Sequence, residues 1–539
     1  MNLMWIVELS LLLGLAAATR IIFILVESSD FDVHLWFIHF YKKNFRLDNK
    51  QVKTALNKGY VGYPPLPHIL ISRLPKKYWI AAGILGNIGF DLLSVMVIYF
   101  SSNWFLGGNE FAQVKPLMSV GGICALIFLT SPTLHPLTAR LMAMGGRTLS
   151  NLLILCYFIA FAFLFISKLY ILIPICIILG ILVILSSQFG LQVLTFFSVG
   201  LSIYYFDVLP LLVLAACFVT GIITPKLGIK QQLTAKISHY AWYNTAFPGR
   251  STDKRNSFRE IWPLFKRMFT TTGKVKAFDH FSNYLVKRFT PFIILYSMPT
   301  LLLFVYWLTS GQIQLDQLIL NERMNYAFAI STIGFVTFLL VSLKPLAFLG
   351  EAERYLEYST SFFSILFLYS FMSANTTFSL LLLLVVYQVF IILVNFILSL
   401  KSNLLAKFMI QPDASFNTLI DFLKSLGPRK YLSIPTKLNA KLSIHLQDQS
   451  FFHIYHVFQP DKGLKHTIED HQVHHFVKPD FNYFIDKYGA NILVTHKESL
   501  LKSAKMGVSY SLEKLRLMYE NNDYAVYELS SNIKQTEAG

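Results

Sequence analysis

The feature that most constrains this chain is a series of long apolar runs. A helix that crosses the hydrocarbon core of a bilayer needs about 20 mostly apolar residues, because its backbone polar groups can bond only to one another there. Only 14% of the 539 residues are charged, whereas soluble domains carry about 25%. We predict about 11 spans, at 4–26, 79–101, 116–132, 149–167, 169–186, 189–206, 208–224, 291–309, 326–348, 359–373 and 376–399.

This composition excludes an ordinary water-soluble enzyme. It also excludes a disordered chain, because 54% of the residues are hydrophobic. The predicted fold class is an α-helical polytopic membrane protein with a small C-terminal α/β soluble domain. We assign residues 1–404 to the transmembrane domain, with long loops at 27–78 and 225–290, and residues 405–539 to the soluble domain.

The soluble domain is predicted from short local patterns. The stretch "SFNTLIDFLKSLG" favours a helix with Ser415 as N-cap and Gly427 as its stop. The stretches "KYLSIP", "LSIHL", "NILVTH" and "YAVYEL" favour strands. At the other end of the chain, we expect the first span to be retained rather than cleaved as a signal peptide, because it contains Arg20 and lacks a basic leader.

Both long loops contain amphipathic patterns. In "VHLWFIHFYKKNF", Val33, Trp36, Phe37 and Phe40 share one side of a helix, which favours an interfacial helix. Residues 225–290 mix basic residues with aromatic ones and favour amphipathic helices lying on the membrane. Most of the formal net charge of +17 lies in such loops, at 42–77 and 226–288. Basic loops attract phosphate head groups or anionic lipid-linked substrates; simple adhesion to membrane lipids is the alternative.

The polar residues of the spans and the cysteines are less informative. Arg20 within the first span favours a functional role or snorkelling to the interface. We assign no role to Asp91 or Asp207. All four cysteines lie in apolar runs, so we predict neither a disulfide framework nor cysteine-bound zinc. The histidines of "HTIEDHQVHHFVKPD" favour a solvated loop over a metal site.

The sharpest polar cluster is "ESSDFDVH", directly after the first span. In an extended segment Asp30 and Asp32 would point the same way, whereas a helix would place them on different faces. A carboxylate at a membrane edge suits general-base chemistry, because desolvation raises its basicity. The alternative is an acidic cap on the helix that follows.

The same loop ends in "GYVGYPPLPH". Its two adjacent prolines fix the backbone and exclude helix at that point. The result is a rigid corner that would present Tyr63 at the depth of the interface. Alone, this corner indicates only a turn before the chain re-enters the membrane.

Together, "DFDVH" and the following "YPPL" resemble the C-type glycosyltransferase superfamily (GT-C). Their wording is most similar to the dolichyl-phosphate-glucose glucosyltransferases. The resemblance implies a polytopic enzyme that uses a polyprenyl-phosphate-linked sugar on the extracytoplasmic side. It implies that Asp30 is the catalytic base and Asp32 the second acidic position, with His34 and Tyr63 as substrate-binding candidates. These motifs cover about the first 100 residues.

Two later segments fit the same resemblance. "SPTLHPLTARLMAMGGRT" contains His135, Arg140 and Arg147 and resembles the donor-facing polar loop of such enzymes, although their His-rich wording is missing. "FLGEAERYLEYS" resembles an "ERY" element, in which Arg354 would contact the donor phosphate. A guanidinium matches phosphate oxygens, and Glu351 and Glu353 would orient it. An Arg–Glu pair on the surface at a helix start is the alternative.

The expected reaction transfers a sugar from a polyprenyl-phosphate donor to a hydroxyl of a glycan or glycolipid, by inversion, without cofactor or metal. The chain lacks nucleotide-binding loops, which favours a lipid-linked donor, and we expect no nucleic-acid partner. The protein would lie in a bacterial inner membrane or, in a eukaryote, in the ER membrane. The basic first loop conflicts with this orientation under the positive-inside rule. A flippase of lipid-linked sugars and an inactive scaffold subunit are the alternatives.

Overall fold

The computed structural model describes residues 3–24, 31–43, 52–56, 59–107, 118–134, 145–245, 256, 258–270, 274–374, 376–407, 414–446, 449–452, 457–458, 471–473 and 476–530. The chain forms two compact units, each described here by itself. The helical unit comprises Met1–Ser28, Ile80–Thr220 and Gly249–Leu405. The sheet unit comprises Ser29–Trp79, Gly221–Pro248 and Ala406–Gly539, so it includes residues from the first long loop.

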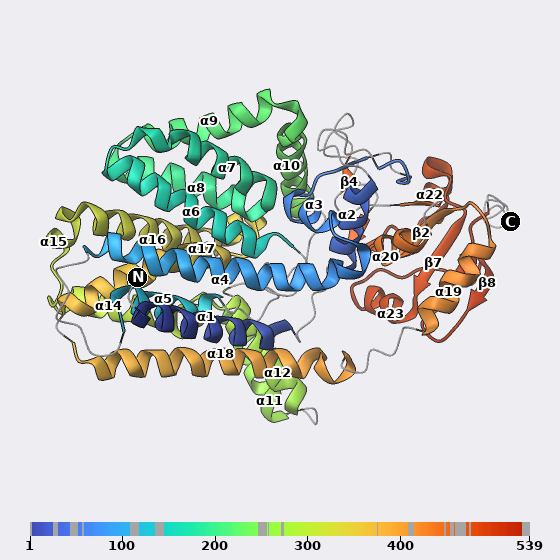
Figure 1. The fold of residues 1–539 in the computed structure, drawn as a ribbon. Helices are drawn as coiled ribbons and strands as arrows, with labels where there is room; N and C mark the ends of the chain where they lie inside the picture. The colour runs from blue at the N-terminus through green and yellow to red at the C-terminus, as the bar shows by residue number, and fades with distance from the viewer. Residues whose placement is uncertain are drawn as a thin grey trace. The chain divides into compact units, whose positions relative to one another are not determined.

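The helical unit is built from helices that coincide with the predicted spans. They are α1 (Leu3–Ile24), α4 (Trp79–Phe105), α5 (Val120–Thr130), α6 (Arg147–Ile166), α7 (Ile173–Ser186), α8 (Gln188–Tyr205), α9 (Leu209–Ile223), α13 (Thr290–Ser297), α14 (Pro299–Thr309), α16 (Glu322–Val341), α17 (Glu353–Ser373) and α18 (Phe378–Lys407). The unit also contains α11 (Phe258–Thr270), α12 (Lys274–Arg288) and α15 (Leu315–Leu320). Figure 1 shows α1, α4, α16 and α18 running in roughly one direction.

By length and composition, four described helices can cross a membrane: Lys76–Phe105, Arg147–Ile166, Glu322–Val341 and Phe378–Ile397. There are five if the pair α13–α14 counts as one span. This pair is bent by 87° between Ser297 and Pro299. Helices α5 and α9 are apolar but shorter, at 11 and 15 residues. The apolar helices define a membrane protein, and the number of about 11 crossings stays a prediction.

Of the two predictions made for Arg20, snorkelling is wrong, because its guanidinium is buried. Its Nε donates to Oδ2 of Asp91 over 2.9 Å, and both side chains are buried. The pair therefore joins α1 to α4 inside the unit, and snorkelling is excluded. Asp207 has a local role, since its carboxylate accepts from the backbone N–H of Leu209 at the start of α9.

The sheet unit contains a five-stranded sheet in the order β3-β2-β7-β9-β8. Its strands are β2 (Lys430–Ile434), β3 (Ser450–Phe451), β7 (Ile492–His496), β8 (Arg516–Glu520) and β9 (Tyr524–Glu528). Strand β2 pairs parallel with β3 and β7, and β9 pairs antiparallel with β7 and β8. The remaining strands form two-stranded ribbons: β1 (Tyr60–Val61) with β4 (Val457–Phe458), and β5 (His471–Val473) with β6 (Phe476–Val477).

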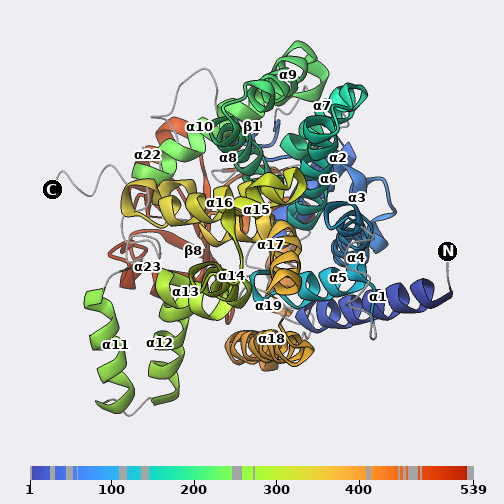
Figure 2. The ribbon, with the colours of Figure 1, turned by 90° about the vertical axis from the view of Figure 1, so that its left-hand side faces the viewer.

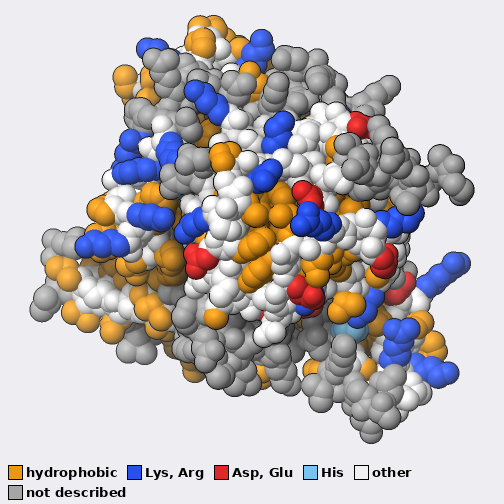
Figure 3. All heavy atoms as spheres, turned by 90° about the vertical axis from the view of Figure 1, so that its right-hand side faces the viewer, with side chains coloured by type: hydrophobic (Ala, Val, Ile, Leu, Met, Phe, Trp, Pro, Cys, Tyr) orange, Lys and Arg blue, Asp and Glu red, His pale blue; other side chains and the backbone are white. Residues whose placement is uncertain are grey.

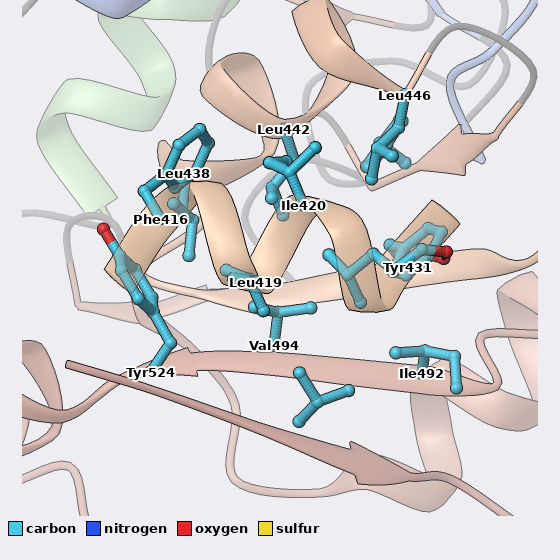
Figure 4. Packing of buried hydrophobic residues seen from close by; sticks show 13 residues of the cluster. Phe416, Leu419, Ile420, Tyr431, Leu438, Leu442, Leu446, Ile492, Val494 and Tyr524 are labelled. Atoms are coloured by element: carbon cyan, nitrogen blue, oxygen red, sulfur yellow. The ribbon is translucent and has the colours of Figure 1, made fainter. Parts of the chain in front are cut away.

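Successive residues of a strand point to opposite faces, so the sheet has two hydrophobic faces. On one face Tyr431 and Val494 pack with α19 (Ala414–Ser425) and α20 (Leu438–His445) (Figure 4). On the other, Leu432 and Leu493 pack with α22 (Phe481–Tyr488). Helix α23 (Lys497–Lys505) follows β7, while α2 (Phe31–Lys43), α3 (Leu66–Ser72) and α10 (Ile229–Thr245) come from the other parts of the unit.

The exposed surface of the C-terminal segment carries paired charges. Lys502 and Glu498 form an ion pair of 2.8 Å on α23, and Arg516 and Glu528 form one of 3.3 Å between β8 and β9. Figure 3 shows Lys and Arg side chains interspersed with Asp and Glu on one face of the molecule. Exposed pairs of this kind contribute about 1 kcal/mol or less each.

The structure corrects two local predictions. "LSIHL" is not a strand but the end of helix α20. Its alternating pattern arises because the helix is buried on two sides, with Leu442 in one hydrophobic cluster and Ile444 in another. Helix α19 begins at Ala414, so Ser415 lies within its first turn rather than at the N-cap. The strands predicted at "KYLSIP", "NILVTH" and "YAVYEL" are confirmed.

The Arg20–Asp91 pair gives a test of the helical unit. Replacing Arg20 by Met leaves the Asp91 carboxylate buried without its cation, which costs roughly 3–5 kcal/mol. We expect Arg20→Met to lower the unfolding midpoint of the detergent-solubilised protein strongly, and the double variant Arg20→Met/Asp91→Leu to recover most of the loss. Lys344→Met, at an exposed position, serves as the control. A double variant as unstable as the sum of the two single variants would contradict the pairing.

Candidate functional site

The two motif segments of the first loop meet in the sheet unit through a pair of histidines. Nδ1 of His34 in α2 lies 2.9 Å from Nε2 of His68 in α3. Both side chains are buried, at 6% and 0% exposure. The rings are parallel, with centroids 5.2 Å apart. One nitrogen must donate and the other accept, so the pair cannot be doubly protonated while the bond persists.

Aromatic rings enclose this histidine pair. Tyr63, from the proline corner, stacks on Phe37 at a centroid distance of 5.0 Å. It also meets His34 and His68 edge-on, at 5.5 and 5.6 Å. Pro64 and Pro65 directly precede α3, and Nδ1 of His68 lies 3.3 Å from the carbonyl oxygen of Pro64. The predicted substrate-binding candidates His34 and Tyr63 are therefore in contact.

The loop is held in place by the C-terminal sheet. The backbone N–H of Leu56 donates to the Phe451 carbonyl, and that of Phe451 donates to Thr54, both over 2.8 Å. Strand β1 pairs antiparallel with β4, with Tyr60 opposite Phe458. In addition, the apolar face predicted for residues 33–40 is buried against Ala440 and Ile444 of α20. The helix is confirmed, but it contacts protein on this face rather than lipid.

Of the acidic pair, Asp32 lies within the described residues. Helix α2 begins at Phe31, so Asp32 lies in its first turn and is half-buried. The extended alternative is therefore wrong from Phe31 onward, and a carboxylate in a first turn is stabilised by the helix dipole. Asp30, the proposed base, lies outside the described residues.

Burial and nearby lysines lower the pKa values of histidines close to α2. Burial lowers the pKa of His39, and the charges of Lys43 and Lys76 lower it further. The pKa of His445 is lowered by burial and by Lys76 and Lys441, while the charge of Asp32 opposes this shift. Burial, followed by the neighbouring His34, holds the pKa of His68 well below its usual range. These rings are therefore neutral near pH 7.

In the helical unit, Arg147 is bonded to a buried carboxylate that the sequence analysis did not single out. Nε and Nη2 of Arg147 both donate to Oε2 of Glu357, the former over 2.9 Å. Asn151 donates to the other oxygen, Oε1. The Glu357 side chain has no exposed surface, whereas Arg147 retains 14%. The signal in the sequence was an ionisable residue next to an apolar span, which indicates function by default.

Arg354 lies at the start of α17 and is held from two sides. Its Nε donates to Oε2 of Glu351 over 2.7 Å, and its guanidinium lies 3.8 Å from the ring centroid of Phe189. The side chain is 23% exposed. This is more enclosed than an ordinary surface pair. Glu353 begins α17 and is half-buried, but the carboxylate bonded to Arg354 is that of Glu351.

A small cavity with many hydroxyl groups adjoins the bend between α13 and α14. Its lining residues are Ile127, Ser131, Thr133, Ser297, Met298, Thr300, Thr360, Phe363 and Ser364. Thr133 and Thr360 bond directly over 2.7 Å. Glu357, Thr360 and Ser364 are spaced to share one face of α17. Irregular backbone at membrane depth is tolerated where it is buried or lines a cavity, which accounts for a sharp bend at this place.

Several of the predicted residues lie outside the described part of the chain. His135 and Arg140 lie outside the described residues, as do His466, His474 and His475. Of His471 only the backbone, in β5, is described. Within the described ranges, no group of three or more His, Cys, Asp or Glu side chains could hold a metal ion.

Comparison with known proteins finds similarity to solved structures but not to family models or curated sequences. No family model and no curated protein sequence matches the chain. The crystal structure of the Archaeoglobus fulgidus oligosaccharyltransferase, tethered to an acceptor peptide through a disulfide bond, matches with a TM-score of 0.49 and 11% identity. The match covers 98% of this chain and 74% of that one. Similarity at this level assigns neither a family nor an activity.

The buried histidines predict a pH dependence for the sheet unit. A histidine whose pKa is lowered by folding takes up its proton more readily in the unfolded chain, so stability is present above the unfolded pKa of about 6.5 and is lost as the pH falls below it. We expect pulse proteolysis of the full-length protein in urea to show a lower unfolding midpoint for the sheet unit at pH 5.5 than at pH 7.5 (roughly one pH unit on either side of that pKa).

The variant His68→Gln should weaken this dependence because it removes the most strongly shifted group. His280→Gln, at an exposed position of α12, should leave it unchanged. An unfolding midpoint that rises as the pH falls would contradict the neutral, buried state of these rings.

Proposed function

We propose that this protein is a GT-C-type membrane glycosyltransferase that moves a sugar from a polyprenyl-phosphate donor to an acceptor hydroxyl. The observation that carries the proposal is the meeting of the two motif segments. "DFDVH" and "YPPL" resemble one family of such enzymes. His34 of the first motif and His68, two residues after the second, lie 2.9 Å apart in a buried aromatic cluster. If the two segments resembled the family only by chance, they would have no reason to pack together across 34 residues of sequence.

In the proposed reaction Asp30 takes the proton from the acceptor hydroxyl as its oxygen attacks the anomeric carbon. The bond between that carbon and the phosphate oxygen breaks, with inversion, and polyprenyl phosphate leaves with the bonding electrons. A positioned general base accelerates such a step by roughly 10²–10⁴-fold. Asp32, in the first turn of α2, is the second acidic position and would bind the acceptor or assist Asp30.

Arg140, Arg147 and Arg354 are the proposed ligands of the phosphate, whose negative charge grows in the transition state. Arg147 supports this role because Glu357 uses only its Nε and Nη2 edge. Within the described residues no partner is found for Nη1, which leaves two donors for a phosphate oxygen. The buried Glu357 would fix the direction of the guanidinium.

The remaining candidates would position the substrates. His34 and Tyr63 belong to the aromatic cluster, and an imidazole nitrogen there can donate a hydrogen bond to a sugar hydroxyl or accept one from it. Glu353 would support Arg354 alongside Glu351. No cofactor, metal or nucleic acid enters the proposal. Phosphate is already a good leaving group, and three arginines supply the positive charge that a metal would otherwise provide.

The location is part of the proposal. We infer a multi-pass protein of the bacterial inner membrane, or of the ER membrane in a eukaryote, acting on the extracytoplasmic side. The donor would be the lipid-linked sugar and the acceptor a glycan or glycolipid, with the surrounding lipids as permanent partners.

A flippase of lipid-linked sugars is the second candidate. The observation that favours it is the 87° bend next to a hydroxyl-lined cavity, because broken helices at the bilayer midplane bind substrates in transporters. A flippase would give no reason for the acidic motif and the aromatic corner to be packed together in the sheet unit.

The base assignment can be tested with one substitution. Asp30→Asn keeps the size of the side chain but removes its basicity, so we expect transfer from a synthetic polyprenyl-phosphate sugar in detergent to fall by at least about 10²-fold, as loss of a general base implies. Insertion into the membrane and thermal stability should not change. Asp316→Asn, at an exposed carboxylate of α15, is the control. Near-normal turnover of the Asp30→Asn variant would refute the role of Asp30 as base.

Arg354 gives a second test, directed at donor binding. Hydrogen bonds to charged groups contribute about 1.5–3 kcal/mol, so Arg354→Ala should raise the KM for the donor by roughly tenfold or more while changing the KM for the acceptor little. Arg323→Ala is a matched control, because Arg323 also stacks on an aromatic ring, that of Trp104 at 4.8 Å. If both variants behave alike, Arg354 has a packing role and does not bind phosphate.

A further inference from the structure

The helical hairpin α11–α12 is a feature that the proposed reaction does not use. Helices α11 and α12 pack side by side, and the rings of Phe265 and Phe281 meet at 5.6 Å between them. Figure 2 shows the two helices extending from the side of the helical unit. In both views they run across the direction of α18 rather than along it. If α18 crosses the bilayer, the hairpin lies parallel to the membrane plane.

The base of the hairpin is fixed to the spanning helices by Asn256. Its backbone N–H donates to the Arg288 carbonyl over 3.0 Å, at the end of α12. Its side-chain Oδ1 accepts from the N–H of Thr290 over 2.8 Å, and its Nδ2 donates to the carbonyl of Ser342 over 3.3 Å. The orientation of the hairpin is therefore set by α13 and the end of α16, and not only by the connecting loops.

One face of α11 is aromatic and exposed. Phe258, Trp262, Phe265 and Phe269 are spaced by four, three and four residues, which places them in one narrow stripe. Their exposures are 71%, 68%, 38% and 66%. The aliphatic Ile261, Leu264 and Met268 occupy the next sector of the helix and are half-buried. Phe258, Trp262 and Phe269 thus remain largely uncovered, whereas Phe265 also contacts Phe281 of α12.

Basic residues lie beside the stripe. At 100° per residue, Arg259 and Lys266 fall within about 20° of each other, on the side of the stripe opposite Leu264. Both are exposed. An aromatic stripe with a cationic flank matches the membrane interface, where rings sit at head-group level and cations meet phosphates.

We propose that the α11–α12 hairpin binds the surface of an anionic phospholipid bilayer, with the aromatic stripe inserted among the acyl-chain ends and Arg259 and Lys266 on lipid phosphates. This interaction is independent of the transfer reaction. It would fix how deep the break between α13 and α14 lies below the membrane surface, because α12 leads directly into α13.

The experiment compares the full-length protein in nanodiscs of phosphatidylcholine with that in nanodiscs of phosphatidylcholine mixed with phosphatidylglycerol. Amide hydrogen exchange of residues 258–270 is the readout. We expect exchange to be several-fold slower in the anionic nanodiscs, while the peptide of α16 exchanges equally in both. The double variant Arg259→Gln/Lys266→Gln should remove the difference between the two lipids. Lys226→Gln/Lys230→Gln, which removes two exposed charges of the same basic loop outside the hairpin, should preserve it.

The stripe is tested separately. Trp262→Ser/Phe269→Ser should speed exchange of the same peptide in both lipids. Equal exchange in the two lipids that is also unaffected by the Arg259/Lys266 variant would overturn the proposal. Protection that depends on the number of protein copies per nanodisc would equally overturn it, in favour of a second copy covering the stripe.

Discussion

The bonds between residues 54–61 and the C-terminal sheet determine the shape of the motif region. Phe451 exchanges backbone hydrogen bonds with Thr54 and Leu56, and Tyr60 pairs with Phe458. These contacts join segments about 400 residues apart, so the order of the first loop is coupled to the C-terminal part of the chain. The entropy cost of ordering a long loop, about 1–2 kcal/mol per residue, is met by this pairing and by the burial of α2 against α20.

Two buried carboxylates among the apolar helices are each paired with an arginine. Asp91 neutralises Arg20, and Glu357 binds both Arg147 and Asn151. The two pairs differ in exposure, since Arg20 is fully buried whereas Arg147 reaches the surface of the unit. A fully buried pair joins helices. A pair with one exposed edge can still bind an anion, and for this reason we assign the ligand role to Arg147 rather than to Arg20.

Sequence periodicity predicted the helices of the helical unit well, because the backbone of a long apolar run in lipid can satisfy its hydrogen bonds only by forming a helix. It failed at α20, where two buried sides imitated the alternation of a strand. The docking of α2 on α20 could not be predicted, since an amphipathic helix next to a membrane shows the same pattern whether it faces lipid or protein. Glu357 stood within a quoted motif, but only the fold reveals that Arg147, 210 residues earlier, is its partner.

Covalent transfer of the sugar can be detected by mass spectrometry of the wild-type reaction. The purified protein is mixed in detergent with a synthetic polyprenyl-phosphate sugar and a glycolipid acceptor. The account predicts free polyprenyl phosphate and an acceptor heavier by one sugar residue, formed in equal amounts. A donor that stays intact in detergent yet crosses the bilayer of liposomes containing the protein would contradict it and establish a flippase.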